Sequence, residues 1–142
     1  MTENQLKAQF SSAKDDWSTP QDFFDRYDEI YHFNLDAASD DDNAKCQKHF
    51  TIADDGLSQD WGGYSVWLNP PYGRGIGRWV RKAWEEGQKP DTVVVCLLPA
   101  RTDTSWFHDY CKHGEITFIR GRLKFADHKW NAPFPSMVVV FK

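Results

Sequence analysis

Residues 92–98 carry the feature that most limits how this chain can fold: seven consecutive apolar or β-branched residues, TVVVCLL. A run of this length suits a β-strand and is far too short for a helix that crosses a bilayer. The run has no polar residue at alternate positions, which indicates a strand covered on both of its faces. Such strands belong to sheets with helices on both sides, so the sequence predicts an α/β fold.

Helical and strand patterns alternate along most of the chain, and the last part contains strand patterns only. The alternation predicts a mostly parallel sheet with an antiparallel edge and helices on both faces. Helices are predicted over residues 20–31, 76–86 and 106–111, with another short one beginning at Asn43. Strands are predicted over residues 32–35, 65–68, 92–98, 116–119, 121–125 and 137–141, and a loop over residues 52–64.

Two of the helices have recognisable end signals. Ser18 or Thr19 is a suitable N-cap for the first helix, and Pro20 suits its first helical position. Gly87 follows the apolar pattern of the helix over residues 76–86, where it is predicted to close that helix.

The length and composition predict one cytoplasmic domain. With 142 residues and no repeat or linker, we expect a folded domain over residues 17–142, preceded by a polar, flexible segment over residues 1–16. The N-terminus lacks the apolar region of a signal peptide, and the three cysteines are an odd number, which favours reduced thiols. A net charge of −4 argues against permanent residence on nucleic acid, but it allows an enzyme that visits it.

The most informative residues for function are Asn69, Pro70, Pro71 and Tyr72, directly after a predicted buried strand. Ligands of open α/β sheets bind at the carboxyl ends of strands. Two successive prolines remove two backbone N–H donors and fix two φ angles. The Asn69 side-chain carbonyl and the Pro70 backbone carbonyl can therefore each accept an N–H from an amino group, while Tyr72 lies flat against the ring that carries it.

Such a turn suits the activation of an aromatic exocyclic amine. The amine is a poor nucleophile because its lone pair is delocalised into the ring. Two fixed acceptors favour the more pyramidal nitrogen that forms in the transition state. An electrophilic methyl donor held in line with this nitrogen then reacts because the two groups are close together.

At these residues the chain resembles amino methyltransferases that use S-adenosylmethionine, and most closely the small phage-type DNA N6-adenine methyltransferases. The resemblance extends over residues 17–142 and implies an abridged Rossmann-like methyltransferase fold. It also implies methyl transfer to the N6 amine of an adenine flipped out of DNA, with Asn69, Pro70, Pro71 and Tyr72 as catalytic residues. Further similar segments are residues 17–20, 35–39, 55–57, 97–101, 121–125 and 133–136.

The same resemblance implies where S-adenosylmethionine binds. The chain departs from the usual pattern in two ways: residues 37–39 replace a Gly-rich motif, and residues 36–55 are too few for the usual strand that ends in an acidic ribose ligand. Asn43 is the candidate for that ribose contact. The implied cofactor residues are Trp17, Thr19, Pro20, Asp36, Ala37, Ala38, Asn43 and Asp55.

The resemblance also makes DNA the expected substrate, and basic residues near the predicted strand ends are candidates for contact with its phosphates. These are Arg74, Arg101, Arg120 and Arg122. No metal site is predicted, because the Cys and His residues lack regular ligand spacing.

Other functions fit the same residues. A glutamine amide of a protein and the amine of an RNA guanine are also planar amines that such a turn can hold. The abridged cofactor region additionally fits a catalytically inactive module that binds nucleic acid or cofactor. The target sequence cannot be read because the chain shows no separate recognition domain, and a homodimer would supply more surface to grip a duplex.

Overall fold

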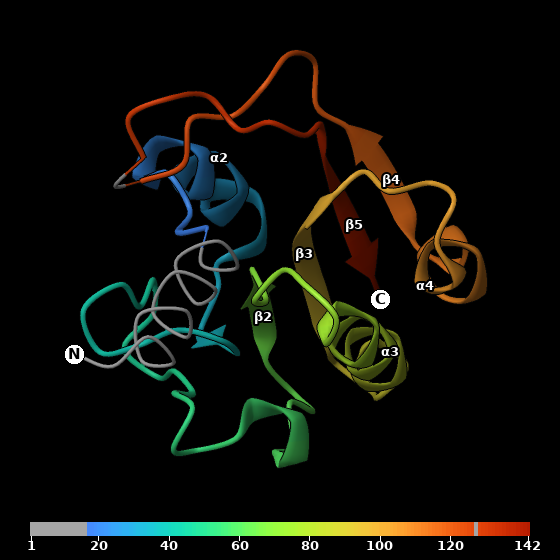
Figure 1. Ribbon diagram of the computed structural model, residues 1–142. Helices are drawn as coiled ribbons and strands as arrows, with labels where there is room; N and C mark the ends of the chain where they lie inside the picture. The colour runs from blue at the N-terminus through green and yellow to red at the C-terminus, as the bar shows by residue number, and fades with distance from the viewer. Residues whose placement is uncertain (1–16, 127) are drawn as a thin grey trace, which may run out of the picture.

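A five-stranded sheet forms the centre of the computed structural model, which describes residues 17–126 and 128–142 (Figure 1). The flexible segment predicted over residues 1–16 lies outside the described residues. In chain order the elements are α2 (Gln21–Tyr31), β1 (Leu35–Asp36), η1 (Gly56–Ser58), β2 (Ser65–Leu68), α3 (Ile76–Gly87), β3 (Val93–Pro99), α4 (Ser105–Asp109), η2 (Cys111–His113), β4 (Glu115–Phe118) and β5 (Ser136–Phe141).

The sheet has the order β1-β2-β3-β5-β4 and is parallel across its first three strands. β5 runs antiparallel to both β3 and β4, with Val95 opposite Val140 and Thr117 opposite Val138. The predicted α/β class, with a mostly parallel sheet and antiparallel pairing at one edge, is confirmed. The uninterrupted apolar run is β3, whose residues from Val94 to Pro99 are all buried.

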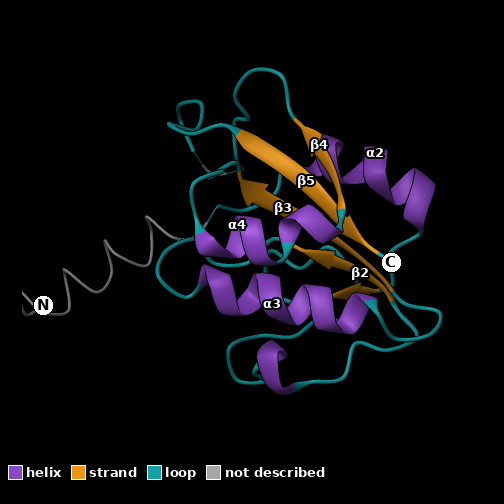
Figure 2. Cartoon of the chain, turned by 90° about the vertical axis from the view of Figure 1, so that its right-hand side faces the viewer, coloured by secondary structure: helices purple, strands orange, loops and turns teal. Residues whose placement is uncertain are grey.

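Helices cover both faces of the sheet, with α2 on one side and α3 and α4 on the other (Figures 1 and 2). On the α2 side, the ring of Trp67 in β2 meets Phe24 edge-on, with 5.3 Å between centroids. On the other side, α3 is packed on β3. Gly87 belongs to α3 and does not cap it as predicted. A side chain at Gly87 would place its Cβ 2.6 Å from the Cβ of Phe141, so close packing against β5 explains this glycine.

Three local predictions were wrong. Thr19 does not cap α2; Pro20 is the N-cap residue, and the Thr19 hydroxyl binds Asn69 and Trp67 instead. No helix begins at Asn43, which exchanges hydrogen bonds with Asp40 in a turn. Residues 121–125 form no strand.

The long connections of the chain meet at one edge of the sheet. β1, β2, β3 and β4 run in the same direction, so the segments that follow them emerge together. This edge carries Asp36, Asn69, Arg101 and Arg120, and open α/β sheets bind ligands at such an edge. No helix in the described part of the chain is long and apolar enough to cross a membrane.

Candidate active site

The turn that follows β2 holds the Asn69 amide in one orientation. Its Nδ2 donates to the Thr19 hydroxyl at 3.0 Å and to the backbone carbonyl of Trp17. The indole of Trp67 donates to the same Thr19 oxygen at 3.3 Å. Because both hydrogen-bond acceptors contact Nδ2, the position of the amide oxygen Oδ1 is fixed as well.

The oxygen of that amide has no partner. Asn69 Oδ1 is buried and accepts no hydrogen bond from the described residues, a property it shares with the hydroxyls of Ser39 and Ser136. A buried acceptor without a donor costs about 1–3 kcal/mol. Asn69 and Ser39 both line a large cavity of about 640 Å³, so two unpartnered polar side chains border the same space.

The four residues of the turn differ in what they face. Asn69, Pro70 and Pro71 line the large cavity. Tyr72 is only 2% exposed; its hydroxyl donates to the Leu97 carbonyl at 3.2 Å, and burial raises its pKa well above the usual value. Its ring meets Phe134 edge-on at 5.5 Å. In this arrangement the Tyr72 ring has no exposed face on which a nucleobase could stack.

The walls of the large cavity come from three connections. One wall is formed by the segment after β1, another by the segment that leads into η1, and the third by the turn after β2 together with the start of α3. The lining residues are Trp17, Ala38, Ser39, Asp40, Asp41, Asn43, Phe50, Thr51, Ile52, Ala53, Asp55, Gly56, Leu57, Asn69, Pro70, Pro71, Arg78 and Trp79.

Close contact between the first two walls requires a glycine at position 56. A Cβ on Gly56 would lie 2.3 Å from the carbonyl oxygen of Ala37 and 3.1 Å from the ring of Trp79. The neighbouring Asp55 has a positive φ of 53°, which directs the chain into this contact. The backbone at residues 55 and 56 is therefore shaped to bring the η1 segment against the segment after β1.

An ionic cluster around the buried Glu86 of α3 fixes the η1 segment. Glu86 accepts from the Trp61 backbone N–H at 2.8 Å, lies 3.1 Å from Lys82 Nζ, and pairs with Lys89. The Trp61 indole in turn donates to the Gly56 carbonyl at 3.0 Å. Burial acts to raise the pKa of Glu86, but hydrogen bonds from Lys89, Trp61 and Lys82 outweigh it and hold the pKa below its usual value.

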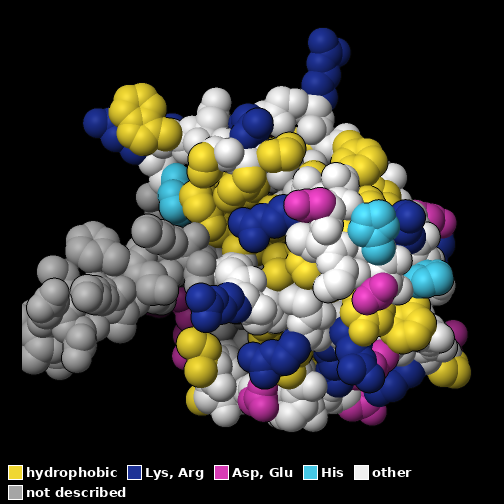
Figure 3. Space-filling view, turned by 45° about the vertical axis from the view of Figure 1, so that its right-hand side comes forward, with side chains coloured by type: hydrophobic (Ala, Val, Ile, Leu, Met, Phe, Trp, Pro, Cys, Tyr) yellow, Lys and Arg dark blue, Asp and Glu magenta, His cyan; other side chains and the backbone are white. Residues whose placement is uncertain are grey.

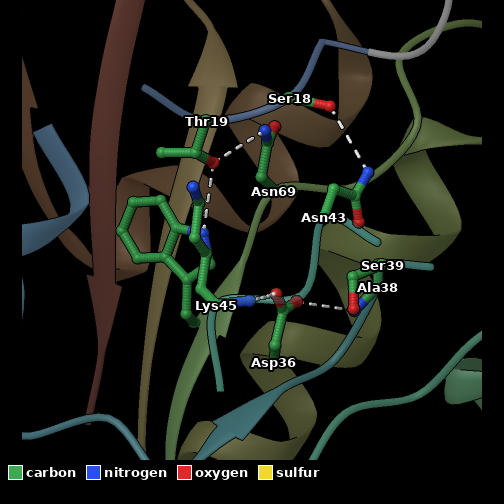
Figure 4. Close-up of a pocket in the computed structure, with 9 residues that line it drawn as sticks. Ser18, Thr19, Asp36, Ala38, Ser39, Asn43, Lys45 and Asn69 are labelled. Carbon is green, nitrogen blue, oxygen red and sulfur yellow. Dashed lines mark hydrogen bonds between the residues drawn. The ribbon is translucent and has the colours of Figure 1, made fainter. Parts of the chain in front are cut away.

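The Asp36 carboxylate holds the segment after β1 in place through hydrogen bonds (Figure 4). It accepts from the backbone N–H groups of Lys45 at 2.9 Å and Ala38 at 3.3 Å. Burial raises its pKa to about 6, and the hydrogen bonds from Lys45 and Ala38 counter only part of that rise. Asp36 lines a small cavity of about 30 Å³ shared with Asn69, and it is absent from the lining of the large one.

The other cofactor residues predicted from the sequence are spread around these cavities. Trp17, Ala38, Asn43 and Asp55 line the large cavity, and Thr19 lines the small one. Asn43 already donates to the Ser18 hydroxyl at 3.3 Å. Ala37 is buried between the walls, and Pro20 is at the start of α2; neither residue lines either cavity.

The four arginines predicted to contact DNA are all exposed and all follow carboxyl ends of strands. Arg74 follows β2, Arg101 follows β3, and Arg120 and Arg122 follow β4. They share the edge that carries the large cavity, but none of them lines it. No group of three or more metal-ligating side chains occurs among residues 17–126 and 128–142.

Sequence reasoning missed Ser39, Trp79 and the role of two aromatic residues. Ser39 lies within the segment over residues 35–39 that resembles the family's cofactor loop, and Trp79 is in the first turn of α3 after the catalytic turn, so their positions were a usable signal. Phe125 and Phe134 lie in the similar segments over residues 121–125 and 133–136, but nothing in those segments indicated their contacts with Trp17 and Tyr72. They meet Trp17 at centroid distances of 5.4 and 5.0 Å, and both also contact Tyr72.

Comparisons with known proteins match this chain to DNA methyltransferases. A family model described as DNA N-6-adenine-methyltransferase (Dam) matches residues 7–141. A DNA N-6-adenine-methyltransferase of Haemophilus phage HP1 (strain HP1c1) is 30% identical over 152 residues, which cover 100% of this chain and 85% of that protein. The enzyme of the same description from Escherichia phage T1 is 36% identical over 115 residues, which are 79% of this chain but 48% of that protein. This chain thus spans about half the length of the phage T1 relative.

Proposed function

The chain belongs to the DNA N-6-adenine-methyltransferase (Dam) family, and from this premise we propose that it transfers a methyl group from S-adenosylmethionine to the N6 amine of an adenine flipped out of DNA. The single observation that carries the proposal is the unpartnered oxygen of Asn69. It is a fixed, buried acceptor at the wall of a cavity, next to two prolines that contribute no donors.

The Asn69 amide supplies one of the acceptors that the chemistry needs. With its nitrogen held by Trp17 and Thr19, the oxygen can accept an N–H of the amine without rotating. An acceptor already in place favours the pyramidal nitrogen without any reorganisation during reaction. The Pro70 carbonyl is the proposed second acceptor. Methyl transfer would form the N–C bond as the methyl–sulfur bond of the cofactor breaks, leaving a neutral thioether, and one amine proton would then leave to solvent.

The large cavity fits the proposed cofactor. Its volume of about 640 Å³ falls within the range of about 300–1,000 Å³ for small-molecule sites. Ser39 offers an unpartnered hydroxyl, and Asp40, Asp41 and Asp55 provide negative charge at the wall. S-adenosylmethionine supplies an electrophilic methyl group on a positively charged sulfur, which such a wall favours. We assign Trp17, Ala38, Ser39, Asn43 and Asp55 to contact with it, and Asp36 to holding the wall.

We propose a supporting role for Tyr72 in the present arrangement. Its hydroxyl ties the turn to β3 through the Leu97 carbonyl, and its ring packs on Phe134. Stacking of the flipped adenine on Tyr72, as expected from the sequence, requires the Phe134 and Phe125 rings packed edge-on against it to move aside.

The test is transfer of a labelled methyl group. The purified chain is incubated with labelled S-adenosylmethionine and, separately, with DNA, RNA or a protein mixture. We expect label on DNA, recovered as N6-methyladenine. Label on RNA or protein instead would contradict the proposed substrate, and a chain that binds no S-adenosylmethionine would be an inactive module.

Asn69→Ala tests the role of the turn in the same assay. We expect transfer to fall by about 10²- to 10³-fold, the size of the loss of one preorganised transition-state contact, while cofactor binding measured by calorimetry persists. A variant with near-full activity would remove Asn69 from the proposed mechanism.

A further inference from the structure

The connection between β4 and β5, residues 119–135, is long for a compact domain and has no helix or strand among its described residues. Loops of this length without secondary structure are uncommon and are usually functional. In Figure 1 this connection crosses from β4 toward α2 before it returns to β5. We call residues 119–126 and 128–135 the arm.

The middle of the arm is anchored beside the proposed active site. Ala126 donates its backbone N–H to the Ser18 carbonyl at 2.9 Å, and the ring of His128 stacks on Trp17 at 4.3 Å. Trp17 in turn lines the large cavity and accepts from Asn69. The arm is therefore tied to the residue that orients the Asn69 amide.

The two limbs of the arm are joined at a neck. Ala132 donates its backbone N–H to the Leu123 carbonyl at 2.7 Å, and both Ala132 and Phe125 are buried. Between the two residues of this neck, Ala126 and His128 pack against Ser18 and Trp17, but the adjacent Lys129 and Trp130 are exposed. Trp130 is 74% exposed, and Lys129 Nζ lies 5.3 Å from the centre of its ring.

An indole exposed to this degree is unusual on the surface of a soluble protein, because Trp normally buries most of its area. The Trp130 ring contacts a flexible lysine and has no aromatic neighbour among the described residues. The arm thus keeps a large planar group in water while Phe125, His128 and Ala132 around it are packed against the protein.

The charge of this connection is opposite to that of the whole chain. Residues 119–135 contain four Lys or Arg and one Asp, whereas the chain carries a net charge of −4. Arg120, Arg122, Lys124 and Lys129 are all exposed. Figure 3 shows Lys and Arg side chains standing among hydrophobic ones on one face of the molecule. An exposed planar ring beside one lysine, on a connection with three further exposed cations, matches the chemistry of nucleic acid, whose bases stack and whose phosphates are negative.

We propose that the arm contacts the DNA duplex beside the target adenine, with the Trp130 indole stacked on an exposed base face and the four cations on the phosphates. The inference rests on the proposed function, because it takes DNA as the substrate. Flipping the target base out of the duplex leaves neighbouring base faces without their partner, and an indole on an arm that packs on the cavity residue Trp17 can cover one of them.

The test compares Trp130→Ala and Trp130→Phe with the wild type, using steady-state methylation of a duplex DNA and calorimetry with S-adenosylmethionine. Stacking contacts are large enough that we expect the KM for DNA to rise about tenfold or more in Trp130→Ala, with cofactor affinity unchanged. Trp130→Phe keeps a stacking face and should recover most of the loss. Ile30→Ala, at a 66% exposed apolar residue of α2, is the matched control and should behave as wild type.

Several outcomes would overturn the proposal. An unchanged KM for DNA in Trp130→Ala removes the indole from the interface, and a Trp130→Phe variant as weak as Trp130→Ala excludes stacking. A wild type that methylates no DNA would instead refute the proposed function itself. A second readout is the salt dependence of duplex binding. Arg120→Gln and Arg122→Gln should each lower the slope of log Kd against log salt by about 0.9, and unchanged slopes would contradict the phosphate contacts.

Discussion

Two long connections emerge at the same edge of the sheet, and they are stabilised in different ways. The connection after β1, together with η1, is held by buried groups: the Asp36 carboxylate, the Glu86 cluster and the close contact at Gly56. The arm after β4 packs through Phe125, His128 and Phe134 but leaves Lys129 and Trp130 exposed. The difference indicates that the two connections have different tasks. A wall for a small molecule needs fixed atoms, whereas a surface for a large, charged partner needs exposed ones.

The largest effect should come from breaking the ionic cluster that holds the wall. Glu86→Ala leaves the Trp61 N–H and the Lys82 ammonium without their buried acceptor. Removing one partner of a buried pair costs about 3–5 kcal/mol, so the free energy of unfolding in urea should fall by about that much. The matched control is Glu85→Ala, whose exposed pair with Arg81 contributes at most about 1 kcal/mol. Equal losses of unfolding free energy in Glu86→Ala and Glu85→Ala would contradict the role of Glu86 as a buried anchor of the wall.

The pH dependence of stability tests the second anchor of the wall. The pKa of Asp36 is about 6 in the folded chain and 3.8 as its ordinary value, so the folded state binds this proton more tightly. Protonated Asp36 therefore stabilises the folded chain fully below pH 4, and this stabilisation is lost as the pH rises to 6. The difference amounts to about 3 kcal/mol.

Asp36→Asn should remove that step from the pH profile of unfolding, although it also leaves one of the two backbone N–H groups without an acceptor. The exposed Asp42→Asn serves as the control and should leave the profile unchanged. A step that persists in Asp36→Asn would show that another group titrates.

A smaller effect is expected where the two walls touch. In Gly56→Ala the new methyl group would collide with the Ala37 carbonyl, so the η1 segment must move away from the proposed cofactor site. We expect the Kd for S-adenosylmethionine to rise about tenfold, which corresponds to about 1.4 kcal/mol. Gly77→Ala is the control, since its Cβ would meet Trp106 at an ordinary 3.6 Å. If Gly56→Ala and Gly77→Ala bind S-adenosylmethionine with equal affinity, the contact between the two walls does not contribute to cofactor binding.

The same comparison explains what the sequence could predict. β3 and the turn after β2 were predicted correctly because their signals are local: an apolar run, and two prolines that end a strand. Residues 121–125 were wrongly predicted to be a strand, because Gly121 adopts a positive φ and Phe125 packs on Trp17, more than a hundred residues away in sequence. The engagement of Thr19 with Asn69 and the burial of Tyr72 depend on contacts of the same long-range kind. The roles given to the site residues stay predictions.

The most direct test of the central claim uses living cells. Genomic DNA from a host without adenine methylation of its own, expressing either the wild type or Asn69→Ala, is digested to nucleosides and measured by mass spectrometry. The account predicts N6-methyladenine in the wild-type sample and almost none with Asn69→Ala at equal protein level. N6-methyladenine absent from both samples, or equally abundant in both, would contradict it.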